Sequence, residues 1–212
     1  MKKEKKVPIV VVKRLPRYYR YLGDLLRQGV MRISSSELSA KMGVTASQIR
    51  QDFNCFGGFG QQGYGYSIET LYREIGDILG LTSGYKSILV GAGNLGHALA
   101  NHIEFVKRGF ELIGIFDNNP ALIGTTINGL TVLSVDTLEE FCTNNQIDIA
   151  ALALPKSATQ TIVDRLVAIG IKGLWNFSYM DINVPDDVAV ENVHMSDSLM
   201  TLSYKIKQIN RD

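Results

Sequence analysis

Residues 87–100 read SILVGAGNLGHALA. They begin with an apolar run of strand length, continue through G-x-G-x-x-G, and end with the apolar spacing of a helix. A strand, a tight turn and a helix in this order predict a dinucleotide-binding turn. Gly91 would allow the sharp reversal of the chain, and Gly93 would let the backbone approach a pyrophosphate. Gly96 would let the helix pack closely on the strand, with the helix N-terminus aimed at the phosphates.

An acidic residue follows at the spacing that such a turn requires. The second predicted strand, residues 111–116, is followed by Asp117, which lies 21 residues past Gly96. That spacing is close to the ~20 residues that separate a glycine turn from a ribose-binding acid. Glycine-rich turns are common and occur in doubly wound domains without a nucleotide, but this context favours a nucleotide site. The expected cofactor contacts here are Gly91, Ala92, Gly93, Asn94, Leu95, Gly96 and Asp117.

From residue 87 onward the pattern alternates between strands and helices. Such alternation predicts an α/β domain of the Rossmann type, with a parallel sheet that binds ligands at the carboxyl ends of its strands. The expected strands are residues 87–90, 111–116, 147–154, 173–177, a short one near Ala189, and a minor edge strand at 130–133. The expected helices are residues 95–107, 135–144 and 158–169.

The first 80 residues predict a helix-turn-helix. Apolar residues recur at helical spacing from Val12 to Gly29, and Pro16 is expected either to open this helix or to kink it. The tetrapeptides SSSE at 34–37 and TASQ at 45–48 both have the spacing of a capping box. They therefore open two short helices, which a turn with glycine separates.

A glycine-rich segment follows the two short helices. Residues 57–66 alternate aromatic residues like a small hairpin, and a helix from residue 67 or 68 to 79 comes next, so the segment is interpreted as a wing. The second helix of the turn would place its first residues on base edges, where Arg50 can bind guanine through two hydrogen bonds. The same helical geometry also occurs without nucleic acid. The candidate DNA contacts are Lys41, Ser47, Gln48, Arg50, Gln51, Gln61 and Gln62.

Charge is distributed unevenly along the chain. Of 22 Lys+Arg and 21 Asp+Glu, residues 1–80 hold 13 and 7, so residues 81–212 hold 9 and 14. A basic half joined to an acidic half indicates a polyanionic partner for the basic half. A solvated lysine-rich tail is the alternative explanation, because residues 2–6 alone supply four of the positive charges.

The remaining composition bounds the class of protein. No window approaches the ~18 consecutive apolar residues of a membrane span, and the start of the chain lacks a signal-peptide core, so we expect a cytoplasmic protein without a membrane partner. Cys55 and Cys142 match no metal spacing, so we expect buried free thiols and no metal.

The end of the chain predicts an amphipathic helix over residues 196–208. Its apolar stripe needs a partner, which is either its own domain or a second subunit. Symmetric DNA half-sites favour a two-fold dimer, and exchange of an element is a low-cost way to form one. The stripe consists of Leu199, Leu202, Ile206 and Ile209. The expected domains are a winged-helix domain at 1–80, a Rossmann domain at 85–194 and a C-terminal dimerisation helix at 195–212.

Six motifs along the chain carry a specific resemblance. They are RLPRYYR at 14–20, QIRQDF at 48–53, FGQQGYGY at 59–66, VGAGNLG at 90–96, GIKGLWNF at 170–177 and VENV at 190–193. Each motif is modest alone, but in this order they resemble the redox-sensing transcriptional repressor family known as Rex. The likeness covers nearly the whole chain.

The resemblance implies a homodimeric repressor that binds operator DNA and senses NADH and NAD⁺. It implies a domain-swapped C-terminal helix, and release of the operator by NADH but not by NAD⁺. The two ligands differ only at the nicotinamide ring, which is neutral in NADH and cationic in NAD⁺, so an apolar pocket would disfavour NAD⁺ through desolvation. By position, the candidates to line that pocket are Pro155, Phe177 and Met195.

The chain departs from the family pattern at residues expected to act. Family members usually carry lysine where Gln51 stands and a basic pair where residues 61–62 stand, so up to three phosphate-directed charges are lost. Some members couple ligand to Arg20 through an acid and a tyrosine. Here the matching positions are His194 and His102, so a direct acid-arginine link through His194 cannot be carried over.

Two other functions fit the same pattern. A small nicotinamide-dependent oxidoreductase would need a proton donor, but His97, His102 and His194 have no adjacent carboxylate in sequence, so no enzyme and no catalytic residue is expected. A regulator that responds to coenzyme A or another nucleotide is the second alternative, because a fold does not determine its ligand.

Overall fold

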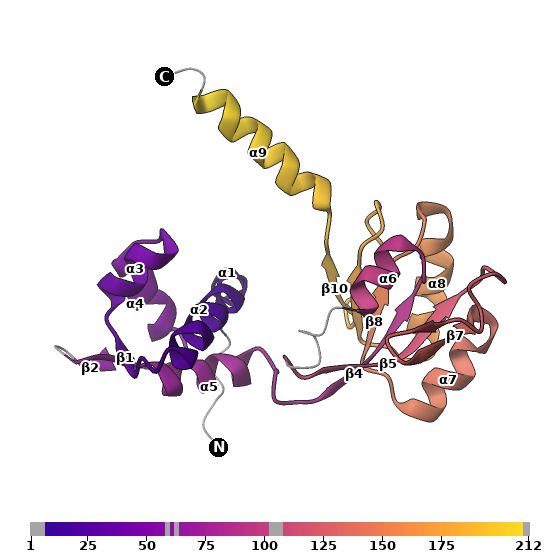
Figure 1. The fold of residues 1–212 in the computed structure, drawn as a ribbon, viewed down its shortest axis with the longest axis horizontal. Coiled ribbons are helices and arrows are strands. Elements are labelled where there is room, and N and C mark those ends of the chain that lie inside the picture. Colours follow the sequence, from indigo (N-terminus) through magenta and orange to yellow (C-terminus); the bar gives the residue numbers. More distant parts are fainter. Residues whose placement is uncertain (1–6, 58–59, 62–63, 102–107, 210–212) are drawn as a thin grey trace. The chain divides into compact units, whose positions relative to one another are not determined.

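The computed structural model describes residues 7–57, 60–61, 64–101 and 108–209. The chain divides into two compact units, Met1–Ser83 and Gly84–Asp212 (Figure 1). The first unit consists mainly of helices and the second contains a large sheet, as the sequence predicts.

The first unit contains a helix-turn-helix whose helices begin at the expected caps. Ser34 and Glu37 form the predicted capping box, and Gly43 ends the first of the two helices with a φ of 63°. Thr45 caps the next helix through its side chain, which accepts from the backbone N–H of Gln48. Of the second predicted capping box, the structure therefore contains the bond to the Thr45 side chain. The helices of this unit are α1 Ile9–Val12, α2 Leu15–Arg27, α3 Ser35–Met42, α4 Ala46–Asn54 and α5 Ile68–Ile78.

Pro16 opens a helix and does not kink one. The chain forms a short α1, turns, and begins α2 at Leu15, so that Pro16 lies in the first turn, where its missing N–H costs nothing. At the other end of α2, Gly29 has a φ of 75° and Val30 N–H donates to the carbonyl of Leu25 over 3.0 Å. This is a Schellman motif, and it places the next segment at an angle to the helix.

The predicted hairpin is part of a three-stranded antiparallel sheet. β2 Gly60–Gln61 pairs with β3 Gly65–Ser67, and β3 also pairs with β1 Arg32–Ile33. The sequence does not predict β1, because two residues are too few for any periodicity. β1 holds the hairpin to the helices, since its Ile33 is 4% exposed and belongs to the core of the unit.

The second unit is a doubly wound α/β domain. Its sheet has the order β10-β9-β8-β4-β5-β7-β6, in which each pair from β10 to β7 is parallel. Without β6 this is the order of a dinucleotide-binding fold, and the order reverses at β4. The strands are β4 Tyr85–Val90, β5 Phe110–Asp117, β6 Thr126–Ile127, β7 Leu130–Ser134, β8 Ile149–Leu152, β9 Gly173–Asn176 and β10 Ala189–Asn192.

Residues 130–134 correct one expectation. The sequence predicts a minor edge strand there, but β7 is a parallel member of the sheet, with β5 on one side and antiparallel β6 on the other. The positive φ of Asn128 and Gly129 forms the tight turn between β6 and β7. Because this turn brings β6 alongside β7, β7 has a strand on each side and is internal to the sheet.

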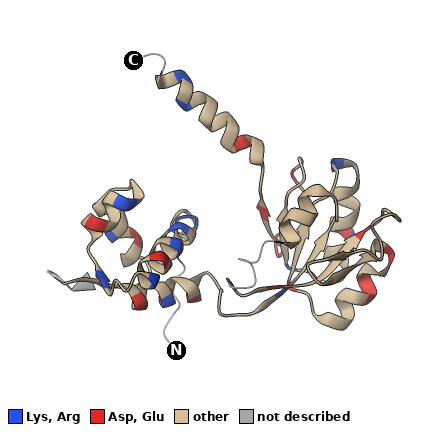
Figure 2. Ribbon diagram, in the orientation of Figure 1, with Lys and Arg blue, Asp and Glu red and all other residues tan. Residues whose placement is uncertain are grey.

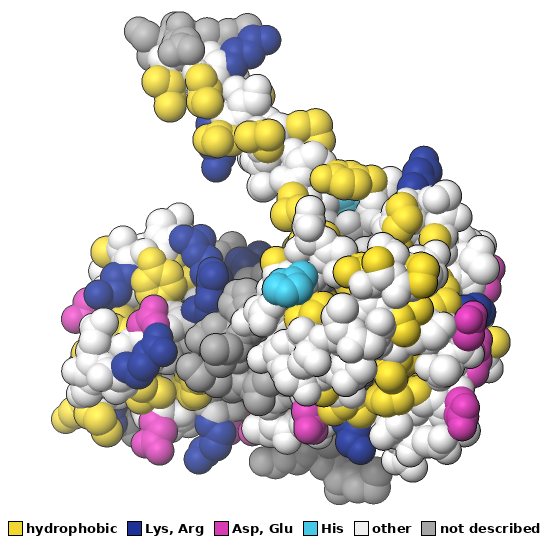
Figure 3. Space-filling view, turned by 45° about the vertical axis from the view of Figure 1, so that its right-hand side comes forward, with side chains coloured by type: hydrophobic (Ala, Val, Ile, Leu, Met, Phe, Trp, Pro, Cys, Tyr) yellow, Lys and Arg dark blue, Asp and Glu magenta, His cyan; other side chains and the backbone are white. Residues whose placement is uncertain are grey.

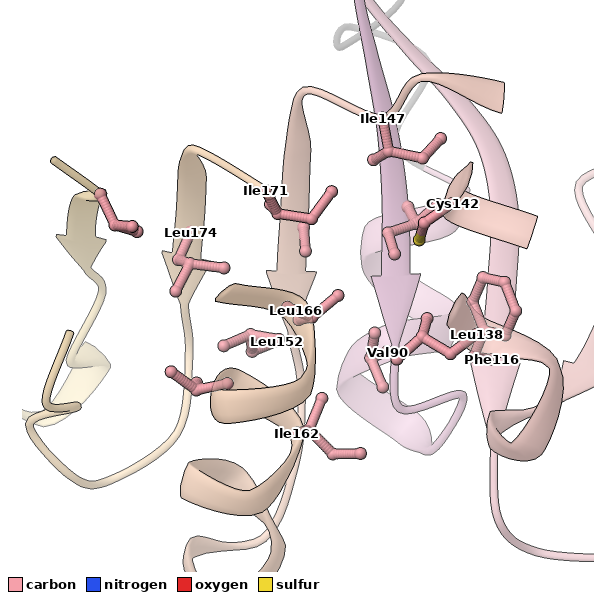
Figure 4. Packing of buried hydrophobic residues seen from close by; sticks show 14 residues of the cluster. Val90, Phe116, Leu138, Cys142, Ile147, Leu152, Ile162, Leu166, Ile171 and Leu174 are labelled. Carbon is pink, nitrogen blue, oxygen red and sulfur yellow. The ribbon is translucent and has the colours of Figure 1, made fainter. Parts of the chain in front are cut away.

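Two apolar clusters cover the two faces of the sheet. Ile88 and Val90 of β4 lie in one cluster and Leu89 in the other, as alternation along a strand requires. Figure 4 shows the first cluster, where Leu138 lies close to Val90 and Phe116. The helices are α6 Asn94–Ala100, the 3-10 helix η2 Val135–Thr137, α7 Leu138–Asn145 and α8 Lys156–Ala168. Of the expected helix 95–107, residues 102–107 lie outside the described part of the chain.

The last helix, α9 Met195–Ile209, buries none of its described residues. Its apolar side chains are exposed and are visible along the helix in Figure 3. The exposed set includes the predicted stripe and extends beyond it: Met195, Leu199, Met200, Leu202, Tyr204, Ile206 and Ile209.

Candidate functional site

The three glycines of the first motif have different surroundings. A Cβ on Gly91 would lie 2.3 Å from the carbonyl oxygen of Ala153, and its φ is 102°. A Cβ on Gly96 would lie 1.8 Å from the carbonyl oxygen of Gly91, so α6 packs directly on the turn. A Cβ on Gly93 would meet nothing within 4 Å. Gly91 and Gly96 are therefore required by the protein itself, whereas the space at Gly93 is open to a ligand.

Asp117 closes the same turn from the neighbouring strand. Its Oδ2 accepts from the backbone N–H of Ala92 over 2.6 Å, and its Oδ1 accepts from the N–H of Asn119 over 2.7 Å. The carboxylate thus lies against the glycine turn at the carboxyl end of β5, where an acid binds a ribose in this fold. Asn94 and Leu95 are the first two residues of α6, so their backbone N–H groups have no acceptor within the helix.

The other pocket candidates follow the next strands of the sheet. Pro155 is exposed and caps α8 after β8, and Phe177 directly follows β9. Phe177 N–H donates to the carbonyl of Leu152 over 3.0 Å, and its ring meets Trp175 edge to face at a centroid distance of 4.5 Å. Both residues therefore lie at the carboxyl edge that holds the glycine turn.

Met195 and His194, at and directly before the start of the last helix, have different surroundings from Pro155 and Phe177. Met195 is the first residue of α9 and is 55% exposed. The Nε2 atom of His194 is buried and has no hydrogen-bond partner among the described residues. Of the other proposed coupling residues, Arg20 is exposed on α2, and His102 lies outside the described residues.

A buried carboxylate organises the helix-turn-helix. Asp52 of α4 is 1% exposed and accepts from Arg14 Nε and Nη2 over 2.7 and 2.6 Å, from Tyr18 Oη over 2.8 Å, and from Gln48 Nε2 over 2.9 Å. Burial alone would raise the pKa of Asp52, but the bonds from Arg14, Tyr18 and Gln48 outweigh it and hold this pKa below its ordinary value. Burial and the bond to Asp52 also raise the pKa of Tyr18.

The remaining DNA candidates are mostly exposed. Ser47, Arg50 and Gln51 lie on the solvent side of α4, and Arg50 Nη1 donates to Ser35 Oγ over 3.0 Å. Lys41 lies in the last turn of α3, and its carbonyl accepts from Tyr21 Oη. Figure 2 shows Lys and Arg on the helices of this unit. Gln61 belongs to β2, and Gln62 lies outside the described residues.

Sequence reasoning missed the roles of Arg14, Tyr18 and Asp52. A signal was available, because Asp52 occurs at helical spacing with Ile49 and Phe53, both buried. An acid within an apolar stripe is expected to have a cationic partner. The partner is 38 residues away in the sequence, so the pairing itself depends on the tertiary fold.

Other chemistry is not evident in the described part of the chain. Within it, no three His, Cys, Asp or Glu side chains gather as metal ligands, and no helix is long and apolar enough to span a membrane. The two cysteines are free: Cys142 is buried as expected, whereas Cys55 is only partly buried.

Comparison with known proteins gives a match for each unit. Residues 6–54 match a family model described as the N-terminus of a putative DNA-binding protein, and residues 82–180 match one described as a CoA binding domain. A redox-sensing transcriptional repressor Rex of Thermoanaerobacter pseudethanolicus is 57% identical over 208 residues, covering 98% of this chain and 93% of the relative. One of Clostridioides difficile is 56% identical over 204 residues, covering 96% and 97%.

Solved structures match over both units. A crystal structure of RSP in complex with β-NAD⁺ and operator DNA has a TM-score of 0.91 and 57% identity, covering 96% of this chain and 94% of that one. A structure of RSP with β-NADH has a TM-score of 0.90 and 54% identity, covering 97% and 96%. RSP is described as a Rex-family repressor.

Proposed function

The chain belongs to the Rex family of redox-sensing transcriptional repressors, and we propose that NADH bound at its glycine turn releases it from operator DNA. It is a DNA-binding repressor that senses the NADH/NAD⁺ ratio. The DNA-reading unit is residues 1–80, the nucleotide domain is residues 85–194, and residues 195–212 form the dimerisation helix. The protein acts in the cytoplasm as a homodimer and requires no metal.

One observation carries the nucleotide assignment. The carboxylate of Asp117 accepts from the backbone of Ala92, beside a Gly93 whose missing side chain leaves open space. A pyrophosphate at Gly93 and a ribose at Asp117 would therefore be held next to each other. The proposed contacts remain the ones expected from the sequence, residues 91–96 and Asp117.

The redox response requires a different affinity for the two forms of the nicotinamide. Adenine, ribose and phosphate contacts are common to NADH and NAD⁺, so they stabilise both complexes equally. Phe177 and Pro155 supply apolar surface at the carboxyl edge of the sheet, which disfavours the cationic ring. Each tenfold preference requires only about 1.4 kcal/mol. Met195 would complete this surface, and Arg20, His102 and His194 would transmit the change to the DNA-reading unit.

A titration of a fluorescent operator tests the proposal. Duplexes that the protein itself selects from a random library supply the operator, and fluorescence anisotropy measures binding. NADH is expected to release the operator at concentrations at which NAD⁺, NADPH and coenzyme A do not. Release by coenzyme A alone would favour the function suggested by the second family model, and oxidation of NADH during the titration would favour an oxidoreductase.

Substitution of Arg50 tests the DNA-reading surface. Arg50→Ala is expected to weaken operator binding by about 1–3 kcal/mol per half-site and to leave NADH affinity unchanged. Arg27→Ala is the matched control, because it removes the same charge from an exposed site at the end of α2. Equal loss in both variants would mean that Arg50 acts only through its charge.

A further inference from the structure

The amide of Gln48 is held in one orientation by a buried carboxylate. Gln48 Nε2 donates to Asp52 Oδ1 over 2.9 Å. Arg14, which directly precedes α2, and Tyr18 of α2 donate to the same carboxylate. Because these bonds outweigh burial, the pKa of Asp52 stays below its ordinary value and the group is ionised at neutral pH. An ionised carboxylate only accepts hydrogen bonds, so the NH₂ end of the amide must face it and the amide cannot turn over.

This bond leaves the amide of Gln48 with one acceptor and one donor. The carbonyl Oε1 and the second N–H of Nε2 are not needed by Asp52. In the major groove, adenine presents a donor at N6 and an acceptor at N7, which is the complement of that pair. Guanine presents acceptors at both O6 and N7, so its O6 would face Oε1.

The position of Gln48 along α4 suits base contact. It is the third residue of the helix, and its N–H donates to the capping Thr45 Oγ1 over 3.1 Å. The first turn of a recognition helix is the part that reaches base edges. The side chain of Gln48 is half-buried, so it has less conformational freedom than the exposed side chains of Ser47 and Gln51.

We propose that Gln48 reads an adenine in each operator half-site and that Asp52 is the positioning residue that determines this preference. The inference rests on the proposed function, because it specifies what one residue of the DNA-reading surface recognises. It assigns Arg14 and Tyr18 to the same task, since both hold the Asp52 carboxylate.

Base substitution in the selected duplex tests the contact. Each position is replaced in turn, and binding is measured for the wild type and for Gln48→Met, which keeps the length of the side chain. Replacing the bases at one symmetric pair of positions is expected to lower the affinity of the wild type about tenfold. The same replacement is expected to leave the affinity of Gln48→Met unchanged. Gln28→Met, at an exposed glutamine after α2, is expected to retain the wild-type profile.

Modified bases then identify the groups that are read. Purine lacks the N6 amino group, and 7-deazaadenine lacks the N7 acceptor. Each is expected to weaken wild-type binding at the identified pair and to leave Gln48→Met unaffected. The inference would be overturned if the wild type selected guanine at the pair of positions where binding depends on Gln48. It would also be overturned if no pair of positions depended on Gln48.

Asp52→Asn tests the positioning role. An asparagine can present either a donor or an acceptor, so the Gln48 amide is free to turn, and the preference for adenine over guanine at that pair is expected to fall severalfold. A merely structural role would lower affinity for all duplexes by the same factor. If the variant does not fold, Gln48→Met and the modified bases still decide the question. Failure of the wild type to select any duplex would overturn the proposed function as well, whereas selection of guanine overturns this inference alone.

Discussion

At the scale of single residues, Asp117 combines a structural role with a proposed role in ligand binding. Both of its carboxylate oxygens accept from backbone N–H groups, so the residue stabilises the glycine turn before any ligand is bound. The same carboxylate lies where a ribose would bind, and there it would repel a 2′-phosphate. We therefore expect selectivity for NADH over NADPH to depend on a residue that also stabilises the glycine turn.

Asp117→Ala is expected to weaken NADH binding and to narrow the difference in affinity between NADH and NADPH. Calorimetric titration with each dinucleotide measures both effects. Asp186→Ala, at an exposed aspartate in the same unit, is the control. Unchanged affinity for both dinucleotides would remove Asp117 from the site.

At the scale of elements, the strand-turn-helix of β4 and α6 is joined by contacts of its own backbone. Gly96 packs on the carbonyl of Gly91, and Gly91 packs on the carbonyl of Ala153, so α6, β4 and the segment after β8 meet at one point. Gly93 alone takes no part in this packing. The fold thus requires Gly91 and Gly96, whereas Gly93 is the residue proposed to make room for the ligand.

Substitutions at two of these glycines are expected to have different effects. Gly93→Ala should retain the unfolding temperature of the wild type and lose tenfold or more in NADH affinity, because its methyl group would occupy the space of the pyrophosphate. Gly96→Ala should lower both the unfolding temperature and the NADH affinity, because its Cβ cannot lie 1.8 Å from an oxygen atom. Thermal unfolding and NADH titration of the two variants provide the comparison. Equal unfolding temperatures for the two variants would contradict this explanation.

The contact between α2 and α4 is sensitive to pH through Asp52. Its pKa is lowered in the folded state, so its ionised form stabilises the unit above the unfolded pKa of about 3.9, and this contribution is lost as the pH falls through the lower folded value. Removing Arg14 would leave a buried charge without its partner, at a cost of about 3 kcal/mol.

Unfolding measured between pH 7 and pH 3 tests this element. The wild type is expected to lose stability below about pH 4 more steeply than Asp52→Asn, which lacks the titrating group. The chain's single tryptophan, Trp175, lies in the second unit, so its fluorescence follows that unit while circular dichroism follows the helices of both. Parallel stability curves for the two proteins would show that Asp52 does not contribute.

At the scale of the whole molecule, α9 is a helix whose apolar side chains are not buried in the described part of the chain. Large apolar side chains on it are exposed, and none of its described residues is buried, although the sheet of the same unit is complete without it. Apolar side chains exposed together on one element are typical of an interaction surface. A helix exchanged between two subunits would bury it and could link a ligand site to a DNA-reading unit.

Deletion of residues 196–212 is expected to convert the proposed dimer to a monomer and to abolish release of DNA by NADH. Light scattering measures the first effect and operator anisotropy the second, with deletion of residues 210–212 as the control. In the full chain, NADH should weaken DNA binding by the same factor by which DNA weakens NADH binding. A truncated protein that remained dimeric and still responded to NADH would show that α9 only covers its own domain.

Local patterns in the sequence determined the elements and the cofactor turn. Caps at Ser34 and Thr45, the stop at Gly29 and the contact of Gly96 with the carbonyl of Gly91 depend on neighbours a few residues away, and such interactions are visible in sequence order. The close approach of Gly91 to Ala153, by contrast, depends on the tertiary fold. The short strand β1, the internal place of β7 and the pairing of Asp52 with Arg14 were decided only in the tertiary structure. Each depends on contacts between residues that the fold brings together. A buried polar group needs a hydrogen-bond partner, and the backbone of a buried strand needs a neighbouring strand.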